Sequence, residues 1–116
     1  MSMSSTDTGH RAERAAANYL EMRGFKIVEL NWRRPRCEVD IIARKDGVVY
    51  FVEVKYRSND NQGGGLDYIT DEKLKRMRRG AETWVVEEKY QGEYQLAAVE
   101  LSGPDFIVEH FIEDVL

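Results

Sequence analysis

An aspartate and a glutamate-x-lysine pattern are the residues of this chain best suited to chemistry. Asp40 lies in CEVDIIAR (37–44), and Glu53 and Lys55 lie in VVYFVEVKYR (48–57). Carboxylate oxygens are the ligands that Mg²⁺ prefers, and an amine two residues further along a strand can hold or activate a water molecule. These residue types are suited to metal-assisted hydrolysis of a phosphodiester.

The turn between the two segments predicts how these side chains meet. Asp46 and Gly47 separate two apolar runs, and Asp-Gly in that position is the strongest short-range signal for a tight β-hairpin. With this turn, Lys45 pairs with Val48, and Asp40 lies opposite Glu53. Opposed carboxylates repel each other unless a cation lies between them, so the pattern predicts a site for Mg²⁺ or Mn²⁺, as one or two ions.

The same register places two more charges beside this pair. Glu38 lies opposite Lys55, and because side chains alternate with period two, all four charged residues project from one face. The opposite face is predicted to carry Val39, Ile41, Val52 and Val54. A second interpretation remains open, in which the charged face is only solvated and Glu38 and Lys55 form a surface ion pair contributing about 0–1 kcal/mol.

The elements that must position these residues follow from hydrophobic periodicity and turn signals. The pattern predicts a helix over 9–23 that ends at Gly24, and a second helix from the cap Thr70 to about Lys89. Strands are predicted at 25–32, 37–44, 48–57, 93–101 and 106–115, the first as a bulged edge strand, and a glycine-rich loop at 58–65. The order is helix, three strands, helix, two strands.

Length and composition predict one globular domain. The chain has 116 residues, of which 42% are hydrophobic and 33% charged, enough for a single core. Residues 1–8 are predicted to be a mobile tail and residues 9–116 a single domain. Because the sequence has neither an apolar run of about 18 residues nor a secretory signal, we expect a cytoplasmic protein without a membrane partner. Cys37, the single cysteine, is interpreted as a small strand residue.

Charge is distributed unevenly along the chain. Residues 1–80 contain 16 basic and 12 acidic side chains, whereas residues 81–116 contain 1 and 9. A partner responds to the local field, which is screened over about 10 Å at physiological salt, so the net charge of -4 leaves a nucleic-acid partner open.

The combination of several motifs resembles the YraN-like family of predicted endonucleases. The motifs are GHRAERAAANYL, GFKIVELNWR, EVDIIA, FVEVKYR and the later Lys73, and the resemblance covers residues 9–113. It implies a restriction-endonuclease-like α/β fold, similar to archaeal Holliday-junction resolvases, with a three-layer core and a mixed sheet of about five strands. The sequence departs from the family pattern at Cys37, where a glycine is usual, and near Ala97, where many members carry an acid.

The resemblance also implies roles for individual residues. Asp40, Glu53 and Lys55 match the family's acid, acid-x-lysine signature as the catalytic residues. Glu13 in the first helix is implied as a further metal ligand beside Asp40 and Glu53, although a glutamate at a helix start is also favoured by the helix dipole. Glu38 is a candidate to orient these ligands without itself binding the metal.

Basic and aromatic side chains near these strands are candidates for nucleic-acid contacts. The basic candidates are Arg33, Arg34, Arg36, Arg57, Lys73 and Arg76, of which Lys73 and Arg57 belong to the family pattern. Any one of those on the second helix is equally explained as part of its wet face. Trp32, Tyr56 and Tyr68 are candidates to stack on bases or to fill the core. Trp84 is assigned to the core, and no role is assigned to His10 or His110.

The sequence therefore predicts a metal-dependent endonuclease acting on DNA, including branched or repair and recombination intermediates. Two alternatives remain: a nucleic-acid-binding module on the same fold with little or no catalysis, and a structural or partner-binding protein. A domain of this size needs a second copy to cut both strands of a duplex symmetrically, which makes a homodimer a candidate assembly.

Overall fold

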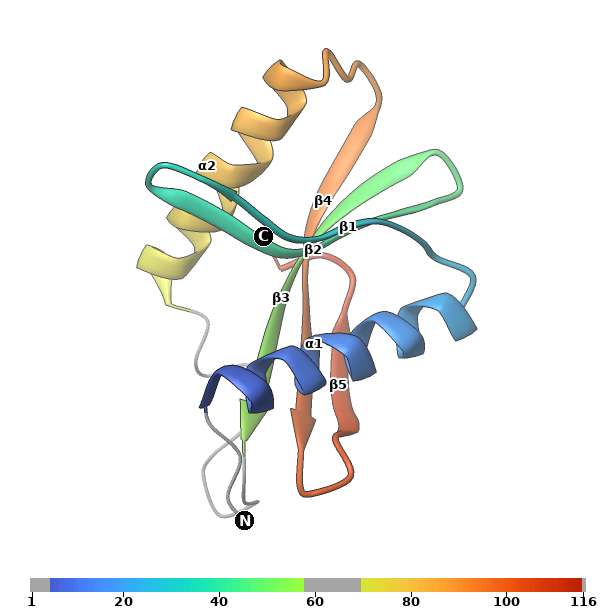
Figure 1. Cartoon of the computed structure of the whole chain (residues 1–116). Coiled ribbons are helices and arrows are strands. Elements are labelled where there is room, and N and C mark those ends of the chain that lie inside the picture. Colours follow the sequence, from blue (N-terminus) through green and yellow to red (C-terminus); the bar gives the residue numbers. More distant parts are fainter. Residues whose placement is uncertain (1–4, 58–69, 116) are drawn as a thin grey trace.

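Seven elements form the chain in the predicted order (Figure 1). A computed structural model describes residues 5–57 and 70–115. The elements are α1 (Ser5–Met22), β1 (Lys26–Arg34), β2 (Cys37–Lys45), β3 (Val48–Arg57), α2 (Asp71–Glu87), β4 (Glu93–Ser102) and β5 (Ile107–Ile112). The predicted loop at 58–65 and Tyr68 lie outside the described residues.

The five strands form one mixed sheet in the order β1-β2-β3-β4-β5. β3 and β4 are parallel, and the other neighbouring pairs are antiparallel. Parallel neighbours need a long crossover, and α2 lies in the connection from β3 to β4. β1 is an edge strand with a register shift between Ile27 and Glu29, which confirms the prediction of a bulged edge.

The two helices cover opposite faces of the sheet and so make three layers. Ala12, Ala16 and Leu20 of α1 are buried with Ile41, Val52 and Val99. Met77, Ala81 and Trp84 of α2 are buried with Ile42, Phe51 and Leu96. α1 crosses over the strands (Figure 1), and its small, buried alanine side chains let it pack closely on them. The predicted core position of Trp84 is confirmed. Neither helix, within the described residues, is long and apolar enough to cross a membrane.

The predicted helix ends are largely confirmed. Gly24 has φ +93°, the left-handed conformation that ends many helices, and the Lys73 N–H donates to Thr70 Oγ1 at 3.2 Å. α1 begins at Ser5, so residues 5–8 are helical, where the sequence predicted a tail. Asp7 lies in the first turn of this helix, where an acidic side chain interacts favourably with the helix dipole.

The hairpin between β2 and β3 has the predicted turn. Asp46 and Gly47 both have positive φ, 52° and 80°, and Lys45 pairs with Val48. The backbone pairing of these strands covers residues 41–45 and 48–52. It ends one pair before Asp40 and Glu53, while β3 stays paired with β4 as far as Arg57. The two strands therefore part at the candidate site.

β2 changes the face it presents to the core at Asp40. Ile41 lies in the cluster on the α1 side, whereas Val39 lies in the cluster on the α2 side, so the prediction that they share a face is wrong. The paired strand changes in the same way, because Leu30 opposite Ile41 packs on the α1 side and Trp32 opposite Val39 on the α2 side. Between them, Asn31 adopts φ 54°, which asparagine tolerates better than most residues.

Candidate functional site

Asp40 lies at the point where β2 leaves β3. Its carboxylate oxygen Oδ2 accepts a hydrogen bond from the Val54 N–H at 2.8 Å. The Asp40 side chain is thus hydrogen-bonded to a β3 backbone amide that lies two residues beyond the last β2–β3 backbone pair, Ile41 and Val52. The prediction that Asp40 pairs directly across the ladder with Glu53 is wrong in this detail, but the hydrogen bond holds Asp40 beside the residue that follows Glu53.

The Asp40 carboxylate is held in an unfavourable electrostatic environment. Burial, and after it the nearby Glu53 carboxylate, raise the pKa of Asp40 from 3.8 to about 8, against the opposing effect of the Val54 hydrogen bond. Glu13 and Glu38 act in the same direction. A carboxyl that keeps its proton at neutral pH because of neighbouring acids lies where a cation would be stabilised.

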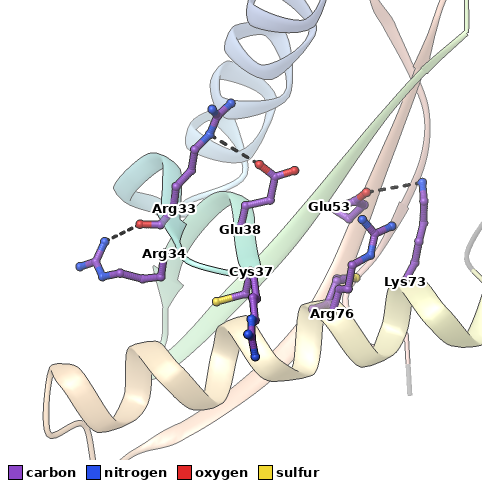
Figure 2. A pocket seen from close by; sticks show the side chains of 9 residues that line it. Arg33, Arg34, Cys37, Glu38, Glu53, Lys73 and Arg76 are labelled. Carbon is purple, nitrogen blue, oxygen red and sulfur yellow. Dashed lines mark hydrogen bonds and ion pairs between the residues drawn. The ribbon is translucent and has the colours of Figure 1, made fainter.

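Two lysines lie close to the Glu53 carboxylate. Lys73 Nζ on α2 lies 3.6 Å and Lys55 Nζ lies 3.8 Å from the same oxygen, Oε1 of Glu53. The side chains of Glu53, Lys55 and Lys73 are 21%, 27% and 20% exposed. Figure 2 shows Glu53 and Lys73 directed toward one another from β3 and α2. These distances describe loose ion pairs that another ligand of either charge could replace.

Glu13 brings a further carboxylate from α1. Burial raises its pKa, and a hydrogen bond from Asn31 opposes that shift. Its Oε1 is buried with no hydrogen-bond partner among the described residues. Buried carboxylate oxygens are rarely left in this state, so Glu13 shares with Asp40 an uncompensated acidic character.

Glu38 has a different partner from the predicted one. It is opposite Arg33 in the β1–β2 ladder, and Arg33 Nε lies 3.5 Å from Glu38 Oε2. The predicted opposition of Glu38 and Lys55 is wrong because the β2–β3 ladder ends at Ile41. Both partners are largely exposed, so this pair contributes little to stability.

A cleft lies between the distal end of the β1–β2 hairpin and α2 (Figure 2). It has a volume of about 390 Å³ and contains most of the predicted basic residues together with two acids. Its lining residues are Arg33, Arg34, Arg36, Cys37, Glu38, Glu53, Lys73, Arg76 and Met77. The cations therefore stand on both walls, and Glu53 links the cleft to Asp40.

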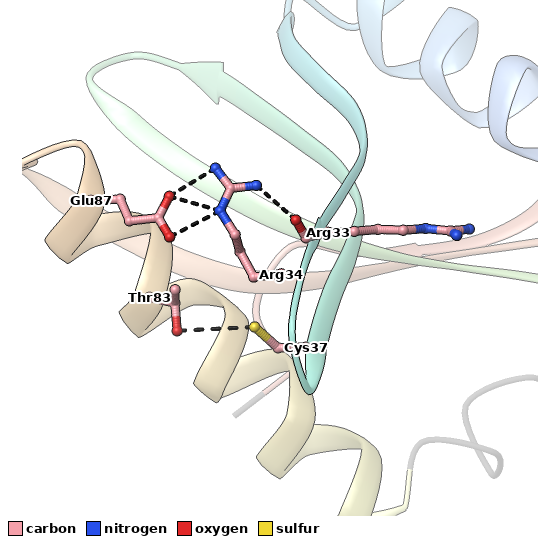
Figure 3. Close-up of polar contacts among 5 residues, drawn as sticks. All are labelled: Arg33, Arg34, Cys37, Thr83 and Glu87. Carbon is pink, nitrogen blue, oxygen red and sulfur yellow. Dashed lines mark hydrogen bonds and ion pairs between the residues drawn. The ribbon is translucent and has the colours of Figure 1, made fainter.

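Two of the predicted basic residues are occupied by other carboxylates. Arg34 forms a bidentate pair with Glu87 of α2, with Nη2–Oε1 2.8 Å and Nε–Oε2 2.9 Å (Figure 3). The Arg34 guanidinium also lies 4.8 Å from the Trp32 ring centroid. Arg57 Nη2 lies 3.0 Å from Glu100 Oε2. Both arginines join elements of the fold, so Arg33, Arg36, Lys73 and Arg76 are the better candidates for phosphate contacts.

Glu100 is the charged residue that the sequence analysis missed. Its side chain is 4% exposed, and it lies between Arg57 and His110, whose Nε2 is 3.7 Å from Oε1. Lys55 and Glu100 are direct neighbours in the parallel β3–β4 register. The alternation of Val99, Glu100 and Leu101 was a weak signal, since it is equally typical of a strand with one wet face.

The two aromatic candidates among the described residues, Trp32 and Tyr56, belong to the fold. Trp32 is 1% exposed, so it fills the core. Tyr56 donates its hydroxyl hydrogen bond to the Gly103 carbonyl at 2.8 Å and stacks on Phe106 with centroids 4.8 Å apart. Cys37 is buried, with Sγ 4.0 Å from Thr83 Oγ1 (Figure 3). His110 lies beside the buried Glu100 carboxylate.

Three carboxylates thus converge from α1, β2 and β3, although their side chains are not arranged as a finished metal site. Within residues 5–57 and 70–115, no three Asp, Glu, His or Cys side chains form a group with metal-ligand geometry. One oxygen of Glu53 is instead approached by the two lysines, Lys55 and Lys73.

Comparison with known sequences points to one family. The profile of the uncharacterised protein family UPF0102 matches residues 12–101, which include Glu13, Asp40 and Glu53. The chain is similar to a UPF0102 protein of Leifsonia xyli subsp. xyli, 42% identical over 78 residues, or 67% of this chain and 66% of that protein. UPF0102 proteins of Sulfurihydrogenibium sp. and Cytophaga hutchinsonii are 37% and 32% identical, covering 87% and 86% of this chain and 89% and 88% of their own lengths.

Proposed function

The chain belongs to the uncharacterised protein family UPF0102, and we propose that it is a metal-dependent endonuclease that hydrolyses phosphodiester bonds in DNA. The observation that carries this proposal is the convergence of Glu13, Asp40 and Glu53 from three elements at the point where two strands part, with lysines beside them. Acidic groups that destabilise one another, next to a cationic cleft, are typical of metal sites that act on phosphates.

The carboxylates fit a divalent ion by their chemistry. Asp40 retains a proton because of burial and its acidic neighbours, and Glu13 has a buried oxygen without a hydrogen-bond partner among the described residues. Asp40 and Glu53 would hold Mg²⁺ or Mn²⁺, with Glu13 as a further ligand for one or two ions. A bound ion would supply Lewis acidity at a phosphate oxygen and lower the pKa of a water molecule.

The lysines supply the chemistry that belongs to the chain itself. In our proposal, Lys55 holds the attacking water by a hydrogen bond beside Glu53, since its amine lies 3.8 Å from the Glu53 carboxylate. Lys73 Nζ lies 3.6 Å from the same oxygen. Its ammonium group would shift from Glu53 to pair with a phosphate oxygen as the substrate arrives. Asp40 stays oriented by the Val54 N–H.

The cleft walls would attract and hold the phosphate backbone. Arg33 and Arg36 stand on the hairpin, and Arg76 stands on α2. Arg36 and Arg76 are exposed, so binding a phosphate would cost little desolvation. Contacts of this kind position a backbone without selecting a base sequence.

The proposal is tested by cleavage of end-labelled DNA with purified protein in Mg²⁺, Mn²⁺ or EDTA. We expect cleavage with the metals alone and its loss in Asp40→Asn, Glu53→Gln and Lys55→Met. Glu29→Gln and Lys26→Met, at exposed β1 positions outside the cleft, are matched controls that retain activity. Equal cleavage by site and control variants would show that the activity lies elsewhere.

A nucleic-acid-binding module without catalysis is the second candidate. The observation in its favour is that both lysines approach Glu53 Oε1, which leaves the acid partly neutralised. In that case Glu53→Gln would raise DNA affinity by freeing the lysines, and no metal would support cleavage. A loss of cleavage with unchanged or higher affinity in the same variant supports the endonuclease.

A further inference from the structure

We infer that the cleft between the β1–β2 hairpin and α2 takes one nucleotide of an unpaired strand, which makes single-stranded DNA or an unpaired segment the substrate class. This inference rests on the proposed function and deepens it. The cleft is a recess next to Glu53, and it is lined by both cationic and apolar side chains.

The size and lining of the cleft suit a nucleotide. Its volume of about 390 Å³ is near the lower end of the roughly 300–1,000 Å³ typical of small-ligand pockets, which is room for a nucleotide but not for a base pair within a duplex. Met77 and Cys37 contribute buried apolar surface suited to a base or sugar, whereas Arg36 and Arg76 supply cations suited to its phosphates.

The cleft is held at a fixed width by the contacts behind it. A Cβ on Gly80 of α2 would come within 2.9 Å of Val39 Cγ2, so the glycine lets the helix and the hairpin approach closely. The bidentate Arg34–Glu87 pair joins the same two elements. These contacts hold the two walls at a spacing that suits one nucleotide better than a base pair.

The depth of the carboxylates leads to the same conclusion. The Glu53 side chain is 21% exposed, and Asp40 is partly buried with its carboxylate accepting a hydrogen bond from the Val54 N–H. A scissile phosphate must enter the recess to reach both acids, and its neighbouring nucleotide must follow into the cleft. An unpaired strand does this without the unstacking and unpairing that a duplex requires.

The test compares the affinity of purified protein for a labelled oligothymidine strand and for a hairpin duplex of the same number of nucleotides, with Ca²⁺ in place of Mg²⁺. We expect the single strand to bind at least about ten-fold more tightly. Arg76→Ala should weaken single-strand binding several-fold, whereas Arg78→Ala should have a smaller effect, because Arg78 is exposed on the same helix and does not line the cleft.

Each outcome decides the inference. Equal or tighter duplex binding, equal effects of the two arginine variants, or no binding to either probe would overturn it. Cleavage of duplex DNA with a loss in Glu53→Gln would overturn the single-strand inference and leave the proposed endonuclease standing. Single-strand binding without cleavage in any metal would support the single-strand inference and overturn the proposed endonuclease. A substrate with one strand also needs one cut, so we expect cleavage by the monomer.

Discussion

Two glutamates on neighbouring strands, Glu53 on β3 and Glu100 on β4, have opposite environments. Glu100 is 4% exposed and its oxygen lies 3.0 Å from the Arg57 guanidinium. Glu53 is 21% exposed and its cationic neighbours stand at 3.6 and 3.8 Å. Glu53 also lies close to Asp40, whose pKa it raises. Burial with a close cation marks a carboxylate that stabilises the fold, whereas loose cations and a second acid mark one that can bind something else.

The largest difference is expected in catalysis. Glu53→Gln should reduce metal-dependent cleavage at least about 100-fold, because losing a carboxylate ligand removes several kcal/mol of metal-based stabilisation. Glu100→Gln, the matched change on the next strand, should leave the cleavage rate per folded molecule within about ten-fold. Cleavage assays on samples whose folded fraction is measured by circular dichroism compare the two. Similar losses in both would make Glu100 part of the reaction site.

Stability should respond in the reverse order. Glu100→Gln should lower the free energy of unfolding by about 3 kcal/mol, because it removes the buried carboxylate that balances Arg57. Glu53→Gln should change it by less than about 1 kcal/mol, since the loss of loose ion pairs is offset by relief from Asp40. Urea unfolding in EDTA measures both. The comparison fails if Glu53→Gln proves the more destabilising.

The dependence of stability on pH should come from the Asp40 carboxyl, the acid beside Glu53. The folded-state pKa of Asp40, about 8, exceeds its ordinary value of 3.8, so the native state keeps a proton that the unfolded chain releases. Metal-free protein should therefore lose stability as pH rises from about 4 to about 8, by on the order of 5 kcal/mol, since each pKa unit corresponds to about 1.4 kcal/mol. Urea unfolding in EDTA across this range should show a shallower decline for Asp40→Asn. An identical slope in that variant would remove Asp40 as the cause.

The smallest effect is expected from the loose lysine. Lys73→Met should change the free energy of unfolding by less than about 1 kcal/mol, while the slope of log affinity for DNA against log salt falls by about 1. Lys75→Met, on the same helix and outside the cleft, is the matched control and should alter the slope less. Titrations by fluorescence anisotropy at several salt concentrations measure this. Equal slopes would assign Lys73 to the structure alone.

Local signals explain why the order of elements and the turn were predictable. Asp46-Gly47 fixes its hairpin by backbone conformation alone, and Gly24 and Thr70 end or begin helices through local hydrogen bonding and φ preference. Asp40, Glu53 and Lys55 were selected by their residue types and by the register of the Asp46-Gly47 turn, and the family resemblance pointed to the same three residues. None of these signals depends on distant contacts.

Other features depend on tertiary packing and could not be predicted. The parting of β2 from β3 at Asp40 coincides with the left-handed Asn31 on β1 and with the packing of Trp32 in the cluster on the α2 side, which strand periodicity does not reveal. The burial of Glu100 depends on β3 and β5 lying on either side of β4. The Arg34–Glu87 pair joins residues far apart in the chain, so Arg34 looked available for phosphate.

The change of face at Asn31 and Asp40 divides the β1–β2 hairpin between two packing units. The half with Leu30 and Ile41 packs with α1, and the half with Trp32 and Val39 packs with α2. The Asp40 carboxylate stands at the boundary of these units. Repacking either core, even at Trp84 or Ala16, should therefore alter the spacing of the acids, so the geometry of the candidate site depends on both hydrophobic layers.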